Sequence, residues 1–156
     1  MENNKFMQEA IKLPAQNLLL NKGWPFGAVV VKGSKIVWKW KNQVTSSNDP
    51  TAHAEIQAIR DACKNLKNFD LSGCVIYTSC EPCPMCYSAI YRARIDKIYY
   101  ANTEKDAAKI WFDDAAIHKD VKNPISKKQI PTKQILREEA IKIFKQRENK
   151  KDKKMY

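Results

Sequence analysis

Residues 75–93, VIYTSCEPCPMCYSAIYRA, decide the fold because they join a strand to a helix across a turn rich in cysteine and proline. Residues 75–78 form a continuous run that favours a buried strand, and residues 85–93 have helical periodicity. Another strand is expected at 95–101. Because strand and helix alternate here, we predict an α/β fold whose sheet has parallel elements and helices on its faces.

Upstream of this stretch the chain predicts a helix and a hairpin. Apolar residues recur at near-helical spacing over residues 5–20, where Pro14 kinks or divides the helix. Strands at 28–31 and 36–40 flank Gly33-Ser34 and predict an antiparallel hairpin. The polar residues 42–50 then predict a loop that leads into the start of a helix.

Downstream of the last strand the pattern is weaker. Residues 107–117 have mixed helical character, and 119–131 read as a polar connector with two prolines. Residues 132–150 predict a final helix. With 156 residues and 18.0 kDa, the whole chain, 1–156, is expected to form a single domain.

The composition excludes several classes of protein. With 44% hydrophobic and 29% charged residues, the chain is neither disordered nor collagen-like. Its apolar runs are far shorter than the roughly 18 residues of a membrane-spanning helix. Residues 1–5 include an acid and lead into no apolar signal segment, so we expect a cytoplasmic protein with no membrane partner.

Positive charge is in excess, with 28 Lys and Arg against 17 Asp and Glu and a net charge of +11. Such a charge attracts anionic partners, nucleic acid among them. Much of it lies in residues 142–154, where a solvated helix face explains it equally well. We therefore do not expect a nucleic acid as the main partner.

Two short motifs begin predicted helices: His53-Ala54-Glu55 and Pro82-Cys83-Pro84-Met85-Cys86. One imidazole and two thiolates are donors that zinc prefers, and three protein ligands leave the fourth tetrahedral position open, as in catalytic sites. Glu55 lies two residues from His53 and is suited to general acid and base catalysis. A metal-free redox protein and a structural zinc module are the alternatives for these cysteines.

The same residues resemble the zinc deaminase signature, His-x-Glu followed by Pro-Cys-x-x-Cys. The chain is similar over nearly its whole length to the cytidine deaminase-like superfamily. That resemblance implies a three-layer α/β/α fold with a mixed central sheet flanked by helices. It also implies one Zn²⁺ per chain on His53, Cys83 and Cys86, with Glu55 as the catalytic residue.

Further segments resemble the base-deaminating branch of that superfamily, namely 25–28, Asn42, 47–55 and 78–86. Within the branch, residues 111–114 (WFDD) and the terminal Tyr156 are similar to bacterial guanine deaminases. This resemblance implies hydrolytic deamination of guanine to xanthine and ammonia. Trp24 and Trp40 depart from it, because they stand where the family commonly has glycine.

Five side chains are candidates for binding the purine base. The amide of Asn42 both donates and accepts hydrogen bonds, and Phe26 is able to pack on the ring or simply in the core. Asp114 is suited to accept from the N–H groups of guanine, although a helix cap or a solvated acid is its alternative. The resemblance adds Tyr156 and Glu139.

The resemblance also implies a homodimer in which residues 132–156 are exchanged between subunits, so that Tyr156 reaches the partner's site. Other functions remain open at this point. They are a tRNA adenosine deaminase, which the charge favours, a guanosine or cytosine deaminase, and a non-catalytic zinc module that binds RNA.

Overall fold

The computed structural model describes residues 2–112, 114–153 and 155. The chain forms two compact units, Met1–Ala116 and Ile117–Tyr156. Asp113 and Tyr156, both named above for their resemblance to guanine deaminases, lie outside the described residues. Among the helices that are described, none is both long enough and apolar enough to cross a lipid bilayer.

A four-stranded mixed sheet forms the centre of the first unit. Its strands are β1 (Gly27–Lys32), β2 (Lys35–Lys41), β3 (Cys74–Cys80) and β4 (Lys97–Asn102), in the order β2-β1-β3-β4. β1 is antiparallel to both β2 and β3, whereas β3 and β4 are parallel. The predicted hairpin and the predicted mixed sheet are both confirmed.

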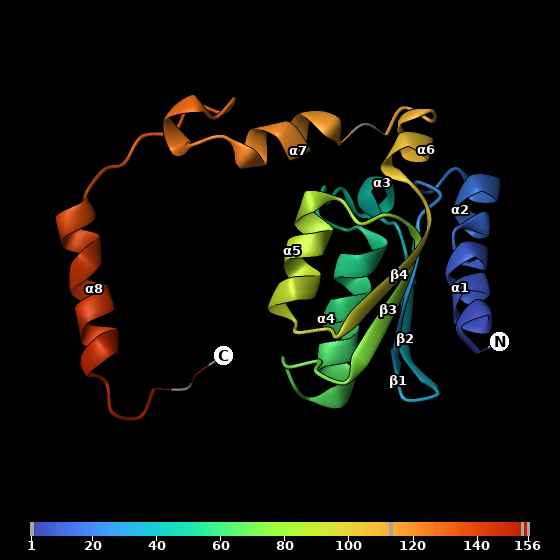
Figure 1. Ribbon diagram of the computed structural model, residues 1–156, viewed down its shortest axis with the longest axis horizontal. Helices are drawn as coiled ribbons and strands as arrows, with labels where there is room; N and C mark the ends of the chain where they lie inside the picture. The colour runs from blue at the N-terminus through green and yellow to red at the C-terminus, as the bar shows by residue number, and fades with distance from the viewer. Residues whose placement is uncertain (1, 113, 154, 156) are drawn as a thin grey trace. The chain divides into compact units, whose positions relative to one another are not determined.

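Helices cover both faces of this sheet, which gives the three layers visible in Figure 1. On one face, α1 (Glu2–Lys12) packs Phe6 and Ala10 against Val29 and Val31 of β1. On the other face, α4 (Ala54–Leu66) and α5 (Pro84–Arg92) cover a second core. Alternate residues of a strand point to opposite faces, so the apolar run of β1 serves both cores.

Pro14 divides the first predicted helix. α1 ends at Lys12, and α2 (Ala15–Leu20) begins immediately after the proline. The predicted loop 42–50 differs from the structure, because Val44–Ser47 forms the short helix α3. Its left-handed C-cap, Asn48 at φ 51°, then turns the chain toward α4.

The segment 107–117, expected to have mixed helical character, contains the ends of two helices separated by a break. A capping box at Thr103 starts α6 at Glu104, and this helix ends at Ala108. Trp111 has a φ of 69°, a left-handed conformation that a continuous α-helix does not contain. A new helix, α7 (Ala115–Lys122), starts after this break.

The second unit is helical where it is regular. The predicted connector 119–131 contains the end of α7 and the 3-10 turn η1 (Ile125–Lys127). The final helix, α8 (Arg137–Asn149), begins five residues later than predicted. Leu136 precedes it in a left-handed conformation at φ 52°, which separates α8 from the residues before it.

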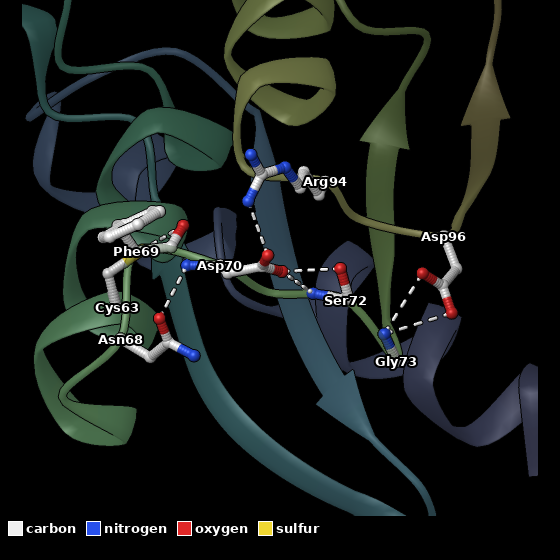
Figure 2. A network of polar contacts seen from close by, with 8 residues as sticks. All are labelled: Cys63, Asn68, Phe69, Asp70, Ser72, Gly73, Arg94 and Asp96. Atoms are coloured by element: carbon white, nitrogen blue, oxygen red, sulfur yellow. Dashed lines mark hydrogen bonds and ion pairs between the residues drawn. The ribbon is translucent and has the colours of Figure 1, made fainter. Parts of the chain in front are cut away.

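A polar network ties together the two loops at the amino-terminal end of β3 (Figure 2). One Asp70 oxygen accepts from the Ser72 backbone N–H at 2.9 Å, and the other lies 2.6 Å from Arg94. The Gly73 N–H is shared by both oxygens of Asp96 at 3.1 Å. The hydrogen bonds from Ser72 and then Arg94 lower the pKa of Asp70 to about 2.

Candidate active site

The two sequence motifs meet because each lies at the amino-terminal end of a helix. His53 is the N-cap of α4, and Cys83 is the N-cap of α5. Both have extended backbone conformations, with ψ near 152° and 167°, and Pro84 follows Cys83 at the first helical position. Cys86 lies in the first turn of α5, where its backbone N–H donates to the Cys83 sulfur at 3.5 Å.

The imidazole and the two sulfurs form a compact group. Nδ1 of His53 lies 3.6 Å from the sulfur of Cys83 and 3.4 Å from that of Cys86. All three ligand atoms are within 4.8 Å of one another, and both cysteines are buried. Such a cluster of three potential ligands could hold a metal ion, and it is the one found among the His, Cys, Asp and Glu side chains of the described residues.

The electrostatics of this group favour a thiolate on one cysteine. A hydrogen bond from the Cys86 side chain, supported by His53, lowers the pKa of Cys83 to about 4. The same hydrogen bond, together with burial, raises the pKa of Cys86. Burial opposes a charge on His53, but its hydrogen bond to Cys83 prevails and raises the pKa of the imidazole. Binding of a metal ion is therefore coupled to loss of the Cys86 proton.

Glu55 lies beside this group in the first turn of α4 and is only 5% exposed. Its Oε2 accepts from the Cys86 sulfur at 3.4 Å, and its Oε1 accepts from the Thr78 hydroxyl at 2.9 Å. Burial raises the pKa of Glu55, which the Thr78 hydrogen bond opposes. A carboxyl group in this environment is suited to hold a proton and to release it.

Aromatic rings line one side of the group. Phe112 lies 5.7 Å from His53, measured between ring centroids, and 4.8 Å from Phe26. Trp24 lies 5.4 Å from Phe112 and is nearly parallel to Phe26 at 6.5 Å. Phe26 therefore belongs to a small aromatic core beside the imidazole, which is the core packing named as its second predicted environment.

Asn42 is completely buried at the end of β2. Its Oδ1 accepts from the backbone N–H of Val44 at 3.2 Å and of Trp24 at 3.4 Å. Its Nδ2 is buried and has no hydrogen-bond partner among the described residues. Asp114 contributes to the raised pKa of His53, which places its charge near the imidazole.

Not every candidate is placed at this site. Glu139 lies on α8, which belongs to the second unit. Thr78 and Phe112 touch Glu55 and His53, although neither was a candidate. Thr78 could have been predicted as a site residue, because it is a polar residue at the end of the predicted strand 75–78 and directly precedes the cysteine-rich segment.

Known proteins resemble this chain, one of them over its full length. A guanine deaminase of Bacillus subtilis is 44% identical over 156 residues, which cover 100% of both chains. Its crystal structure has a TM-score of 0.95 and covers 100% of this chain and 99% of its own. A structure described as a guanine deaminase from Nitrosomonas europaea is 29% identical, with a TM-score of 0.66, and covers 70% of this chain and 64% of its own.

Shorter similarity extends to another branch. A tRNA-specific adenosine deaminase of Aquifex aeolicus is 43% identical over 81 residues, which cover 52% of this chain and 54% of that protein. The family model for the cytidine and deoxycytidylate deaminase zinc-binding region matches residues 1–102, which include both helix-start motifs. The chain therefore belongs to the cytidine and deoxycytidylate deaminase zinc-binding family.

Proposed function

We propose that this chain catalyses the hydrolytic deamination of guanine to xanthine and ammonia. The observation that carries the proposal is the buried Glu55 beside a group of one imidazole and two sulfurs. Full-length similarity to a guanine deaminase supports guanine as the base. Such a reaction belongs to purine catabolism or salvage, and we place it in the cytoplasm.

The group fits one zinc ion per chain, held by His53, Cys83 and Cys86. Nitrogen and sulfur donors suit zinc, and the three ligand atoms already lie within 4.8 Å of one another. Cys83 has a lowered pKa, so one of the ligands is ready as a thiolate. When bound, zinc supplies Lewis acidity that activates water at neutral pH.

Glu55 moves the protons in the proposed reaction. Its carboxylate takes a proton from the attacking water and delivers it to the ring nitrogen next to C2. A second proton transfer lets the amino group leave as ammonia, so guanine and water give xanthine and ammonia. The raised pKa of Glu55 favours this exchange, because the carboxyl group holds the proton readily between the two steps.

Base recognition is assigned to Asn42, Phe26 and Asp114. The Nδ2 of Asn42 lacks a partner among the described residues, so it is available to donate to an acceptor on the purine. Phe26 supports the ring, with the neighbouring Trp24 and Phe112 excluding water. Asp114 accepts from guanine N–H groups.

The C-terminal residues complete the proposal. We assign 1–156 to a single deaminase domain whose segment 132–156 is exchanged within a homodimer. Tyr156 and Glu139 then close the site of the partner. Light scattering of the full chain tests the dimer. Removal of Tyr156 is expected to raise the KM for guanine without loss of bound zinc.

Turnover of the zinc-loaded protein tests the function. We expect xanthine and ammonia from guanine and little product from adenine, cytosine or guanosine. Glu55→Gln is expected to lower kcat by at least about a hundredfold, the usual contribution of general acid and base catalysis. Glu9→Gln, a matched change on α1, should leave kcat unchanged. Absence of turnover on guanine in zinc-replete protein would refute the proposal.

A tRNA adenosine deaminase is the second candidate. The similarity to the Aquifex aeolicus protein and the net charge of +11 favour it. An anticodon stem-loop is the test substrate, with inosine as the product measured. Inosine formation with no xanthine from guanine would select this candidate.

A further inference from the structure

Asn17 connects two segments that border the candidate site. It lies in α2 and is only 1% exposed. Its Nδ2 donates to the backbone carbonyl of Asn42 at 2.7 Å and to that of Trp24 at 3.2 Å. A single side chain thus holds together two residues that are separated by the whole β1–β2 hairpin.

Gly23 shows how tightly this junction is built. A Cβ at this position would lie 2.7 Å from the Asn42 carbonyl oxygen and 2.9 Å from Nδ2 of Asn17. Its φ of 152° also lies in a region that favours glycine. The backbone of residue 23 therefore lies so close to the side-chain amide of Asn17 that only glycine fits at this position.

These contacts leave Asn42 with one group to offer. Its backbone N–H donates to Phe26 at 2.9 Å, and its backbone carbonyl is taken by Asn17. Its Oδ1 accepts from two backbone N–H groups, those of Trp24 and Val44. Only Nδ2 has no partner among the described residues, so the NH₂ end of the amide is the part of Asn42 left to donate a hydrogen bond to a ligand.

Asn17 itself is not an optimal choice for stability. Its Oδ1 is buried and has no hydrogen-bond partner within the described part of the chain. A buried acceptor without a partner is destabilising and is rare in folded proteins. Asparagine at position 17 is explained by its NH₂ group, because this group donates to the backbone carbonyls of both Trp24 and Asn42.

We propose that Asn17 is a positioning residue for substrate binding. By holding the carbonyls of Trp24 and Asn42, it keeps the Asn42 NH₂ group directed at a hydrogen-bond acceptor of the ligand, a ring nitrogen or an exocyclic oxygen of a purine. This inference rests on the proposed function, because it takes Asn42 as a base-binding residue. Asn17 acts through Asn42 and makes no contact with the base itself.

A double-mutant cycle tests this role. We compare Asn17→Ala, Asn42→Ala and the double variant, using KM and kcat for guanine and calorimetric binding of 8-azaguanine. Asn17→Ala is expected to weaken 8-azaguanine binding and to raise KM by about 3- to 10-fold, the worth of one hydrogen bond. Its kcat should stay within about twofold of the parent, as should its zinc content.

The double variant separates positioning from general destabilisation. If Asn17 acts through Asn42, the double variant binds 8-azaguanine no more than about twofold more weakly than Asn42→Ala alone. Fully additive losses, or a loss confined to kcat, would overturn the inference. Gln16→Ala, an exposed amide one residue away, is the matched control and should behave as the parent.

A spectroscopic measurement keeps the inference testable whatever the activity. In the milder variant Asn17→Ser, we expect the side-chain NH₂ resonances of Asn42 to shift and broaden in the ligand-free protein. Unchanged Asn42 resonances in this variant would count against positioning. Because no substrate is present, the result stands even if the parent fails to deaminate guanine, an outcome that would refute the proposed function alone.

Discussion

The Thr78 hydroxyl lies 2.9 Å from Oε1 of Glu55 and 2.8 Å from the backbone carbonyl oxygen of Cys80. A hydroxyl has one proton to donate and lone pairs with which to accept. When Glu55 is ionised, Thr78 donates to its carboxylate. When Glu55 carries a proton, Thr78 accepts from it and donates to Cys80. One side chain at the end of β3 therefore serves both forms of the acid.

Replacement of Thr78 tests this relationship. Thr78→Val keeps the shape but removes the hydroxyl, so Glu55 loses a buried partner. We expect kcat for guanine to fall by about tenfold, the upper range for a single hydrogen bond, with KM little changed. Thr78→Ser should recover most of the activity. Equal kcat values for the valine variant and the parent would show that the hydroxyl has no part in catalysis.

Metal removal should affect both activity and stability. The proposed ligands join the start of α4 to the start of α5, so an ion bound there stabilises only the folded chain. We expect chelation to lower Tm by roughly 10 °C and to abolish turnover, with both restored by zinc. Calorimetry and atomic absorption measure these changes.

Variants assign the metal to its ligands. His53→Ala should lose the metal, whereas His118→Ala, which alters the second of the two histidines, should retain it. Cobalt in place of zinc should show sulfur-to-metal charge-transfer absorption that disappears in Cys83→Ser. A full complement of metal in His53→Ala would contradict the proposed ligand set.

Gly27 allows the close packing of α1 on the sheet. A Cβ there would lie 2.3 Å from the carbonyl oxygen of Ala10 and 2.9 Å from Cδ of Pro14. Gly27→Ala should therefore reduce the free energy of unfolding by about 1–3 kcal/mol, measured with urea. Ser34→Ala, in the exposed hairpin turn, should change it by less than about 0.5 kcal/mol. Equal stabilities of the two variants would contradict this packing.

Asp70 should contribute a pH-dependent part of the stability. Its pKa is lowered from 3.8 to about 2, so the folded chain favours the charged form. The contribution is complete above the unfolded pKa and is lost as pH falls toward about 2. Asp70→Asn should therefore melt below the parent at pH 6, with a difference that shrinks below about pH 4. A constant difference across this range would exclude the effect.

The chemistry-bearing residues were predictable because their pattern is local. His53 and Glu55 are two positions apart, and Cys83 and Cys86 share one helical turn, so each pair is visible in a short stretch of sequence. The β1–β2 hairpin and the division at Pro14 were predictable for the same reason. The mixed sheet as a whole was expected from the family resemblance, because β1 pairs with β3 across about 50 residues of chain.

The remaining features depend on distant contacts. Asn17 meets the carbonyl of Asn42 across 25 residues, and no local pattern marks such a contact. The break between α6 and α7 depends on the left-handed conformation of Trp111, a residue type that does not signal such a turn. The start of α8 likewise follows a left-handed leucine, Leu136. Tertiary structure overrides sequence propensity at these points.

The proposed metal ligands and Glu55 come from the first turns of two core helices, whereas Trp24, Asn42 and Phe112 come from loops and a strand end. In the proposed function, selectivity and reactivity are therefore assigned to different parts of the chain. A designer who wants this scaffold to accept another heterocycle can vary the loops and leave the helix ends untouched. Libraries confined to positions 24 and 112, with the buried Asn42 kept because it accepts from two backbone N–H groups, should retain metal loading and folding while exploring new substrates.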